Sequence, residues 1–474
     1  MSTDVVGLVR HPRLLVVTAL VAGLLGSLVL FRANVLPLPA VFGGVQQYDT
    51  PSYLVGSLIP VVGPVTLVLV GLYAARWSRQ WGALRVTALG ALAYPGVDLV
   101  LMVVFNGLSL GSLTSHLLIN LVIVTLASAG NGLLLGGALT LLTGLPTPRR
   151  WLVGGLFAGM LLVGKELVEA VSAGSVAELL AGPVRTDGLQ LVLWVVAAVF
   201  GLALLAADRS DRREPAEPVR DLPAVWPVAR HCLWLLPLCG ALWSVPPLLI
   251  TDARSGLAVL APVLVVLPLA AVLAVRRFFG VDAAVWLLAV LVVGVALYAD
   301  PMDRMTARFG NYPPFRLICS VLAVLAAAAA CWAAGRWPGR WYWHPAAWLL
   351  LTAAVVGGWA FTWTEFGYRG GSQEVFLLIS ALHLLALVTL GASGGLAFHR
   401  LDPTGVLVGG VTAALLVPGF AGFGVLLLQV GDGVLPAAGR VSAGLVAAAV
   451  AAVAAGLVWL LRPTAGSVVA ATDQ

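Results

Sequence analysis

Apolar runs long enough to cross a lipid bilayer recur along the whole length of this chain of 474 residues. A membrane-spanning helix needs about 20 consecutive apolar residues, whereas a membrane β-barrel shows short alternating segments. The composition agrees, because 60% of the residues are hydrophobic and 10% are charged, against about 45–50% and about 25% in a soluble domain. The sequence therefore predicts an all-α polytopic membrane protein.

We expect about fourteen transmembrane helices joined by short loops. Their approximate positions are 13–38, 53–74, 84–106, 116–143, 151–174, 189–207, 231–251, 257–275, 281–299, 316–335, 345–363, 375–398, 406–429 and 441–462. Most of the 27 basic residues fall in segments that an alternation of spans places on one side. By the positive-inside rule, both termini are predicted to be cytoplasmic. This topology also accounts for the net charge of +6, so no nucleic-acid partner is expected.

Weak internal similarity indicates a repeat. Residues 72–85 are similar to 331–343, and residues 125–135 are similar to 389–398, both at an offset of roughly 260 residues and eight spans. An even span offset predicts parallel repeats related by an axis along the membrane normal. The predicted organisation is a six-helix domain at 1–207, a cytoplasmic linker at 208–230, two inserted helices at 231–280 and a second six-helix domain at 281–474.

Three short segments carry a family resemblance. They are "NVLPLPAVFGG" from Asn34, "GLYAARWSRQ" from Gly71 and "SAGNGLLLGGALTLLTGLPTPRR" from Ser128. Together with the 6+2+6 arrangement they resemble the major facilitator superfamily, and within it the fourteen-span drug:proton antiporter branch. The second segment resembles the cytoplasmic gating loop of that family, which implies a gating role for Gly71, Arg76 and Arg79. The acidic residue of the family's motif is replaced here by Ala75.

The resemblance implies a secondary active transporter in the cell (plasma) membrane that exports a small amphipathic or drug-like compound by alternating access. Its partners would be a small-molecule substrate and the lipid bilayer, and coupling to protons stays open. Two alternatives also stay open: a transport-inactive relative that serves as an assembly or sensory partner, and a lipid flippase on the same fold. The family's Gly-Pro antiporter signature in span five is absent, and "KELVEAVSAG" from Lys165 stands in its place.

Five ionisable residues fall within predicted spans: Arg32, Asp98, Lys165, Glu166 and Glu169. A charge at the bilayer centre costs about 2.5–3.5 kcal/mol, so each is a candidate for substrate binding or coupling. Counting about 1.5 Å per residue from the start of span five places Lys165 and Glu166 in the outer half of the bilayer and Glu169 near the outer interface.

These charges also suggest their own partners. Lys165 and Glu169 are four residues apart and can pair along one helix face. Glu166 points elsewhere, and Arg32 is its expected partner because spans one and five are neighbours in the resembling fold. The structural alternative is that Lys165 and Glu169 form a self-satisfied pair. His383, in span twelve, is expected to be a satisfied core histidine.

Enzymatic chemistry finds no support in the sequence. There is no His/Cys/Asp ligand set, nucleotide-binding glycine loop or nucleophile–base spacing, so we expect no catalytic residues, cofactor or metal. The four cysteines do not suggest a disulfide framework. The stretch 300–316, "DPMDRMTARFGNYPPFR", is interpreted as the outward loop between spans nine and ten.

Overall fold

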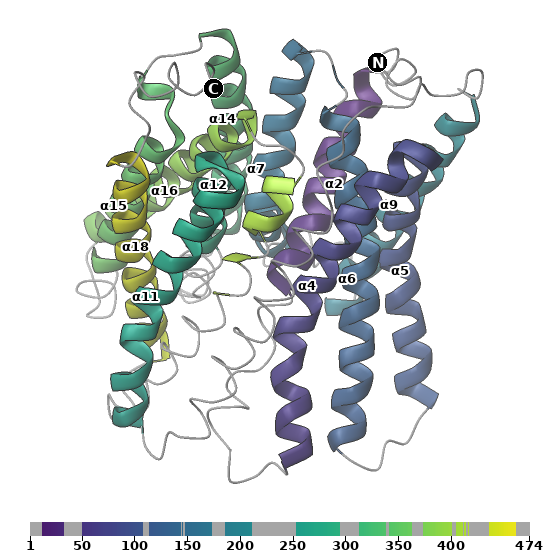
Figure 1. Cartoon of the computed structure of the whole chain (residues 1–474), viewed down its shortest axis with the longest axis horizontal. Helices are drawn as coiled ribbons and strands as arrows, with labels where there is room; N and C mark the ends of the chain where they lie inside the picture. Colours follow the sequence, from purple (N-terminus) through teal and green to yellow (C-terminus); the bar gives the residue numbers. More distant parts are fainter. Residues whose placement is uncertain are drawn as a thin grey trace, which may run out of the picture.

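The computed structural model is built from α-helices over the residues that it describes, and no strand occurs among them (Figure 1). The described residues are 12–32, 50–107, 113–143, 145, 147–172, 185–210, 253–293, 312–337, 341–362, 373–400, 404–410, 412, 413, 416 and 436–460. The predicted span 231–251 and most of the predicted span 406–429 lie outside them.

The helices form two groups. The N-terminal helix group comprises α2 (Pro12–Arg32), α4 (Thr50–Trp81), α5 (Ala83–Gly107), α6 (Leu113–Thr143), α7 (Thr147–Ser172) and α9 (Arg185–Ser210). The C-terminal helix group comprises α12 (Val281–Val292), α14 (Tyr312–Arg336), α15 (Pro345–Thr362), α16 (Gln373–Arg400), α18 (Pro436–Leu460) and residues 404–410. A further helix, α11 (Ala253–Phe279), packs against α12 and α18, and a 3₁₀ turn, η2 (Trp341–Trp343), precedes α15. In Figure 1 the two groups stand side by side, with α7 and α14 between them.

Six described helices are long and apolar enough to cross a membrane: Leu121–Thr143, Arg149–Val168, Pro262–Phe279, Phe315–Arg336, Pro345–Thr362 and Glu374–His399. Shorter apolar stretches occur in α2, α4, α9, α12 and α18. These helices coincide with predicted spans, which supports a multi-pass membrane protein. The count of fourteen spans, the 6+2+6 layout and the cytoplasmic termini stay predictions.

The packing pattern repeats between the two groups. In the first group α4 packs on α6, α6 on α5 and α5 on α9; in the second α14 packs on α16, α16 on α15 and α15 on α18. The helices that the sequence comparison paired, α4 with α14 and α6 with α16, therefore occupy equivalent positions. Glycines make the close approaches, as predicted for α6: a side chain on Gly132 or Gly136 would overlap the backbone of α4.

Single glycines connect two pairs of successive helices. Gly82 joins α4 to α5 with φ 90°, and Gly280 joins α11 to α12 with φ 92°. These values lie in the left-handed region that residues with a side chain rarely adopt. Both glycine carbonyls accept a hydrogen bond from the next helix, at Val86 and Ala284. Helix α4 thus runs on to Trp81, and the predicted gating loop at 71–80 is wrong as a loop, because the reversal is made at Gly82.

Candidate functional site

The two helix groups meet along the α7–α14 seam, where the helices are in backbone contact. A Cβ on Gly155 would lie 2.6 Å from the Cα of Ala328, and one on Gly159 would lie 2.8 Å from the Cα of Val324. The partner's residue number falls as the α7 number rises, so the helices run antiparallel. Two glycines four residues apart allow this approach, since no side chain separates the helices. The seam also includes α16, which packs on both α7 and α14.

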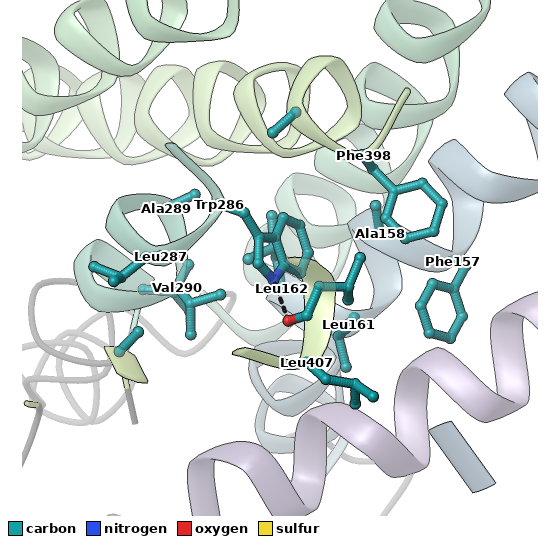
Figure 2. Packing of buried hydrophobic residues seen from close by; sticks show 14 of the residues in the cluster. Phe157, Ala158, Leu161, Leu162, Trp286, Leu287, Ala289, Val290, Phe398 and Leu407 are labelled. Atoms are coloured by element: carbon teal, nitrogen blue, oxygen red, sulfur yellow. Dashed lines mark hydrogen bonds between the residues drawn. The ribbon is translucent and has the colours of Figure 1, made fainter. Parts of the chain in front are cut away.

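An apolar layer fills the space between the groups in the middle of the seam (Figure 2). Trp286 of α12 is the centre of the layer: it is fully buried, its ring packs edge-on to Phe398 at 6.3 Å, and its Nε1–H donates to the Val406 carbonyl at 3.1 Å. From α7, the ring of Phe157 lies 5.6 Å from that of Phe398. The apolar layer comprises Phe157, Leu161, Leu162, Trp286, Phe398 and Leu407.

The layer leaves a cavity of about 10 Å³ at its edge, about the space that one water molecule requires. Both groups line this cavity: Leu67, Leu135, Leu139 and Leu161 from the first, Trp286, Val406, Leu407 and Gly410 from the second. The two groups are therefore closed against each other at this level.

An ion pair bridges the seam about one helical turn beyond the apolar layer. Arg316 Nε donates to Glu166 Oε1 at 2.7 Å, and the side chains are 5% and 1% exposed, respectively. Glu166 follows Leu162 by four residues on α7, and Arg316 lies in the first turns of α14. Because desolvating two charges is expensive, removing one partner of a buried pair typically costs about 3–5 kcal/mol. The pair therefore holds the groups together only while both charges are present.

His383 of α16 lies at the level of this ion pair. Gly391 packs on Ala323 and Gly395 on Ala327, so α16 and α14 run parallel at an offset of 68 residues (391 − 323 = 395 − 327 = 68). The same offset brings His383 level with residue 315, next to Arg316. His383 is completely buried and interacts electrostatically with Glu166 and Arg316. Its ring centroid lies 6.0 Å from that of Trp359 on α15.

Several buried polar atoms around the ion pair have no hydrogen-bond partner within the described part of the chain. They are Glu166 Oε2, Ser320 Oγ, Trp359 Nε1 and both ring nitrogens of His383. Buried polar groups are nearly always hydrogen-bonded, and an unsatisfied one costs about 1–3 kcal/mol. We call Glu166, Arg316, Ser320, Trp359 and His383 the polar cluster. The expectation that His383 is a satisfied core histidine is wrong for the described residues, because packing gives its ring no polar partner there.

The structure changes the expected partner of Glu166. Sequence analysis paired it with Arg32, but its carboxylate accepts from Arg316, which had been assigned to the end of an outward loop. Arg316 is missed because it directly follows a polar stretch, although "RLICSVLAVLAAAA" from Arg316 carries the signal used for the other candidates, a charge leading into an apolar run. Spans one and five are neighbours as expected: the Lys165 backbone N–H donates to Ser27 Oγ of α2 at 3.0 Å.

The remaining sequence-predicted residues are placed on helices but are not brought into the polar cluster by any described contact. Lys165 is partly buried on α7. Arg32, Asp98 and Glu169 lie on α2, α5 and α7, and their side chains fall outside the described residues. Their predicted roles, including the pairing of Lys165 with Glu169, therefore stay predictions.

The three gating candidates lie on the last turns of α4. Gly71 contacts both groups: a Cβ there would lie 3.0 Å from Leu407 of the second group and 3.5 Å from the Gly132 carbonyl of α6. Arg76 is exposed, and the Arg79 side chain lies outside the described residues. Nearby, Arg85 Nε donates to Asp208 Oδ2 at 2.5 Å, which joins α5 to the end of α9 within the first group. Only Gly71 among the three is thus seen at the boundary between the groups.

No group of three or more His, Cys, Asp or Glu side chains that could hold a metal ion occurs among the described residues. No protein-family model matches the chain, and no curated protein matches it in sequence.

Solved structures do match. The xylose transporter XylE from E. coli, in a partially occluded inward-open conformation, aligns over 96% of this chain and 100% of its own with a TM-score of 0.55 at 14% identity. A bacterial homologue of the human drug peptide transporters PepT1 and PepT2 aligns over 96% and 98%, with a TM-score of 0.53 at 16% identity. A structure of proton-dependent oligopeptide transporters aligns over 95% and 98%, with a TM-score of 0.51 at 14% identity. The chain therefore has the fold of the major facilitator superfamily.

Proposed function

We propose that the chain is a secondary transporter of a small solute, in which the two helix groups rock against each other to alternate access. The observation that carries the proposal is the Glu166–Arg316 pair, which joins the groups while buried from solvent on both sides. Such a pair is stable in one arrangement of the groups and costly once either charge loses its partner. It therefore has the property that an alternating-access cycle needs, a contact that is either fully made or fully broken.

The solute that we infer is small and amphipathic. The seam offers an apolar layer and, one turn away, a polar cluster with unsatisfied donors and acceptors. A solute with an apolar body and one polar end would match both when the groups separate, because binding sites combine apolar walls with a few placed polar groups. The similar solved structures are named as transporters of xylose and of peptides, so the fold by itself does not select the solute.

We infer export, with coupling to protons through Glu166. Among the three acidic residues expected to serve coupling, Glu166 is the one whose described surroundings place it between the groups. Protonating its carboxylate removes the negative half of the pair, leaves Arg316 uncompensated and favours separation of the groups. Asp98 and Glu169 are retained as secondary candidates. We also retain the domain organisation of 6+2+6 helices, in which residues 231–280 supply two inserted helices.

The proposal is tested by flux in proteoliposomes. The purified protein is reconstituted, a pH gradient is imposed, and efflux of a set of lipophilic cations is followed for the wild type and for Glu166→Gln, Arg316→Gln and Lys165→Ala. We expect gradient-driven efflux by the wild type and its loss in both ion-pair variants. The matched control is Arg85→Gln, which breaks an ion pair inside one group and should leave efflux unchanged.

Efflux that persists in Glu166→Gln would refute coupling through this carboxylate. If the wild type moves none of the cations and no other small solute supplied inside the vesicles, transport itself is refuted. A transport-inactive relative would then be the better account of the chain.

A further inference from the structure

The polar cluster contains a second ionisable group that the ion pair leaves unused. His383 is completely buried, and neither ring nitrogen has a hydrogen-bond partner among the described residues. The helix register places it level with Arg316, and it interacts electrostatically with both members of the pair. The free oxygen of the pair, Glu166 Oε2, is likewise buried without a described partner. One acceptor oxygen and one imidazole thus stand unsatisfied on opposite sides of the seam.

We propose that Glu166 and His383 together form a binding site for one proton, and that occupancy of this site loosens the α7–α14 seam. The inference deepens the proposed transport function and rests on it. A proton that enters from water binds either to Glu166 Oε2 or to an imidazole nitrogen of His383. Transfer between them moves only that proton: a carboxylic acid and a neutral imidazole become a carboxylate and an imidazolium.

Charge balance gives the mechanical consequence. Without the proton, Glu166 and Arg316 sum to zero and His383 is neutral. With it, the cluster carries one net positive charge on whichever atom the proton resides. An uncompensated charge in a buried site is strongly unfavourable. The arrangement relieves this cost by separating α7 from α14, so that water reaches Arg316.

The other groups facing His383 do not supply a compensating charge. The helices packed on α16 are α7, α12, α14 and α15. From α14, Arg316 and the thiol of Cys319 lie at this level, and α15 contains no charged residue. On α12 the charged residue is Asp282, but the same helix meets α16 through Trp286 at Gly394, three turns from His383. On α7, Lys165 precedes Glu166 and adds positive charge rather than negative.

Native cysteines allow a test that requires no substrate. Cys319 and Cys331 are both buried on α14, and Cys331 lies against Gly155 at the glycine end of the seam. Two full-length single-cysteine proteins are prepared by changing the other three cysteines to serine. Each is labelled in liposomes with N-ethylmaleimide between about pH 8 and pH 5, the range in which histidine titrates. The ratio of the Cys319 rate to the Cys331 rate cancels the common effect of pH on thiol reactivity.

We expect this ratio to rise by about fivefold or more on acidification, the change that a loss of about 1 kcal/mol of contact energy produces. His383→Gln and Glu166→Gln should each remove the rise, while the Arg85→Gln control retains it. A flat ratio in the wild type overturns the proposal, as does a rise that survives in His383→Gln.

Two further measurements keep the outcome decisive. If the glutamine variants do not stay monodisperse after purification, His383→Asn replaces His383→Gln. Infrared difference spectra of the wild type then report directly on the carboxyl C=O band of protonated Glu166. Absence of any band or imidazole signal on acidification counts against the site. Because flux is not measured, a pH-dependent ratio without transport would uphold this inference and refute only the proposed function.

Discussion

The buried ion pair yields a prediction with a sign that intuition would reverse. Changing Glu166 to Met leaves Arg316, which is 5% exposed, as an unpaired buried cation; changing Arg316 to Met leaves Glu166, 1% exposed, as an unpaired buried anion. Each single change is expected to cost about 3–5 kcal/mol. The double variant removes both charges and replaces them with apolar side chains of similar volume, so it should be near neutral or more stable than the wild type.

The magnitude can be checked against an internal standard. The Arg85–Asp208 pair has a similar geometry, with Nε and Oδ2 2.5 Å apart, but the arginine is 38% exposed. Solvent screens a pair of this kind, and its rupture is expected to cost about 0–1 kcal/mol. Arg85→Gln therefore controls for loss of an arginine hydrogen bond without burial.

The assay is a double-mutant cycle on the purified protein in mild detergent, with the free energy of unfolding taken from titration with a denaturing detergent. A coupling energy of several kcal/mol between the two positions is expected. Two results would refute the reasoning: single variants that cost no more than Arg85→Gln, or a double variant whose cost equals the sum of the singles. Either would mean that the charges are solvated and the seam is open at this level.

Three further predictions concern the seam and the apolar layer. Gly159→Leu should destabilise the protein by about 1–3 kcal/mol or more through overpacking against Val324, measured in the same titration; Gly357→Ala, which meets nothing within 4 Å, should change stability little. Trp286→Phe keeps an aromatic ring in the layer but removes the hydrogen bond to the Val406 carbonyl, so it should cost roughly 0.5–1.5 kcal/mol, and an unchanged unfolding midpoint would contradict that bond. Gly71→Val, where a side chain would meet Leu407 of the other group and the backbone of α6, should slow solute flux more than Gly357→Ala does, and equal rates would argue against a contact between the groups at Gly71.

The sequence allowed the helices and much of their packing to be predicted, because both depend on local patterns. Apolar runs marked the spans, and the glycines Gly132 and Gly136 marked the face of α6 that approaches α4. The neighbourhood of α2 and α7 followed from the family resemblance and is confirmed by the contact of Lys165 with Ser27. The continuation of α4 to Trp81 was missed, since a polar segment with two arginines resembles a loop as well as an exposed helix end.

The candidate site was only half predicted. Glu166 was identified because a carboxylate in an apolar helix is costly. Its partner lies 150 residues away, and which of several cations it meets depends on the register between helices of different groups. Sequence periodicity fixes the face of one helix but says nothing of that register. The same limit hid His383, whose lack of a polar partner is a property of its neighbours α14 and α15.

The α7–α14 seam combines two kinds of contact with different mechanical character. Around Gly155 and Gly159 the backbones touch through short-range packing, which tolerates small rotations because it involves no specific partner. Glu166 lies seven residues beyond Gly159, about 10 Å along the helix. A rotation of about 20° about the glycine contact would separate the Glu166–Arg316 pair by about 4 Å, enough to break its hydrogen bond. The glycine end would then act as a pivot and the ionic end as the contact that opens. Cys331 and Cys319 report on these two ends, so equal increases in their labelling on acidification would contradict a pivot at the glycines.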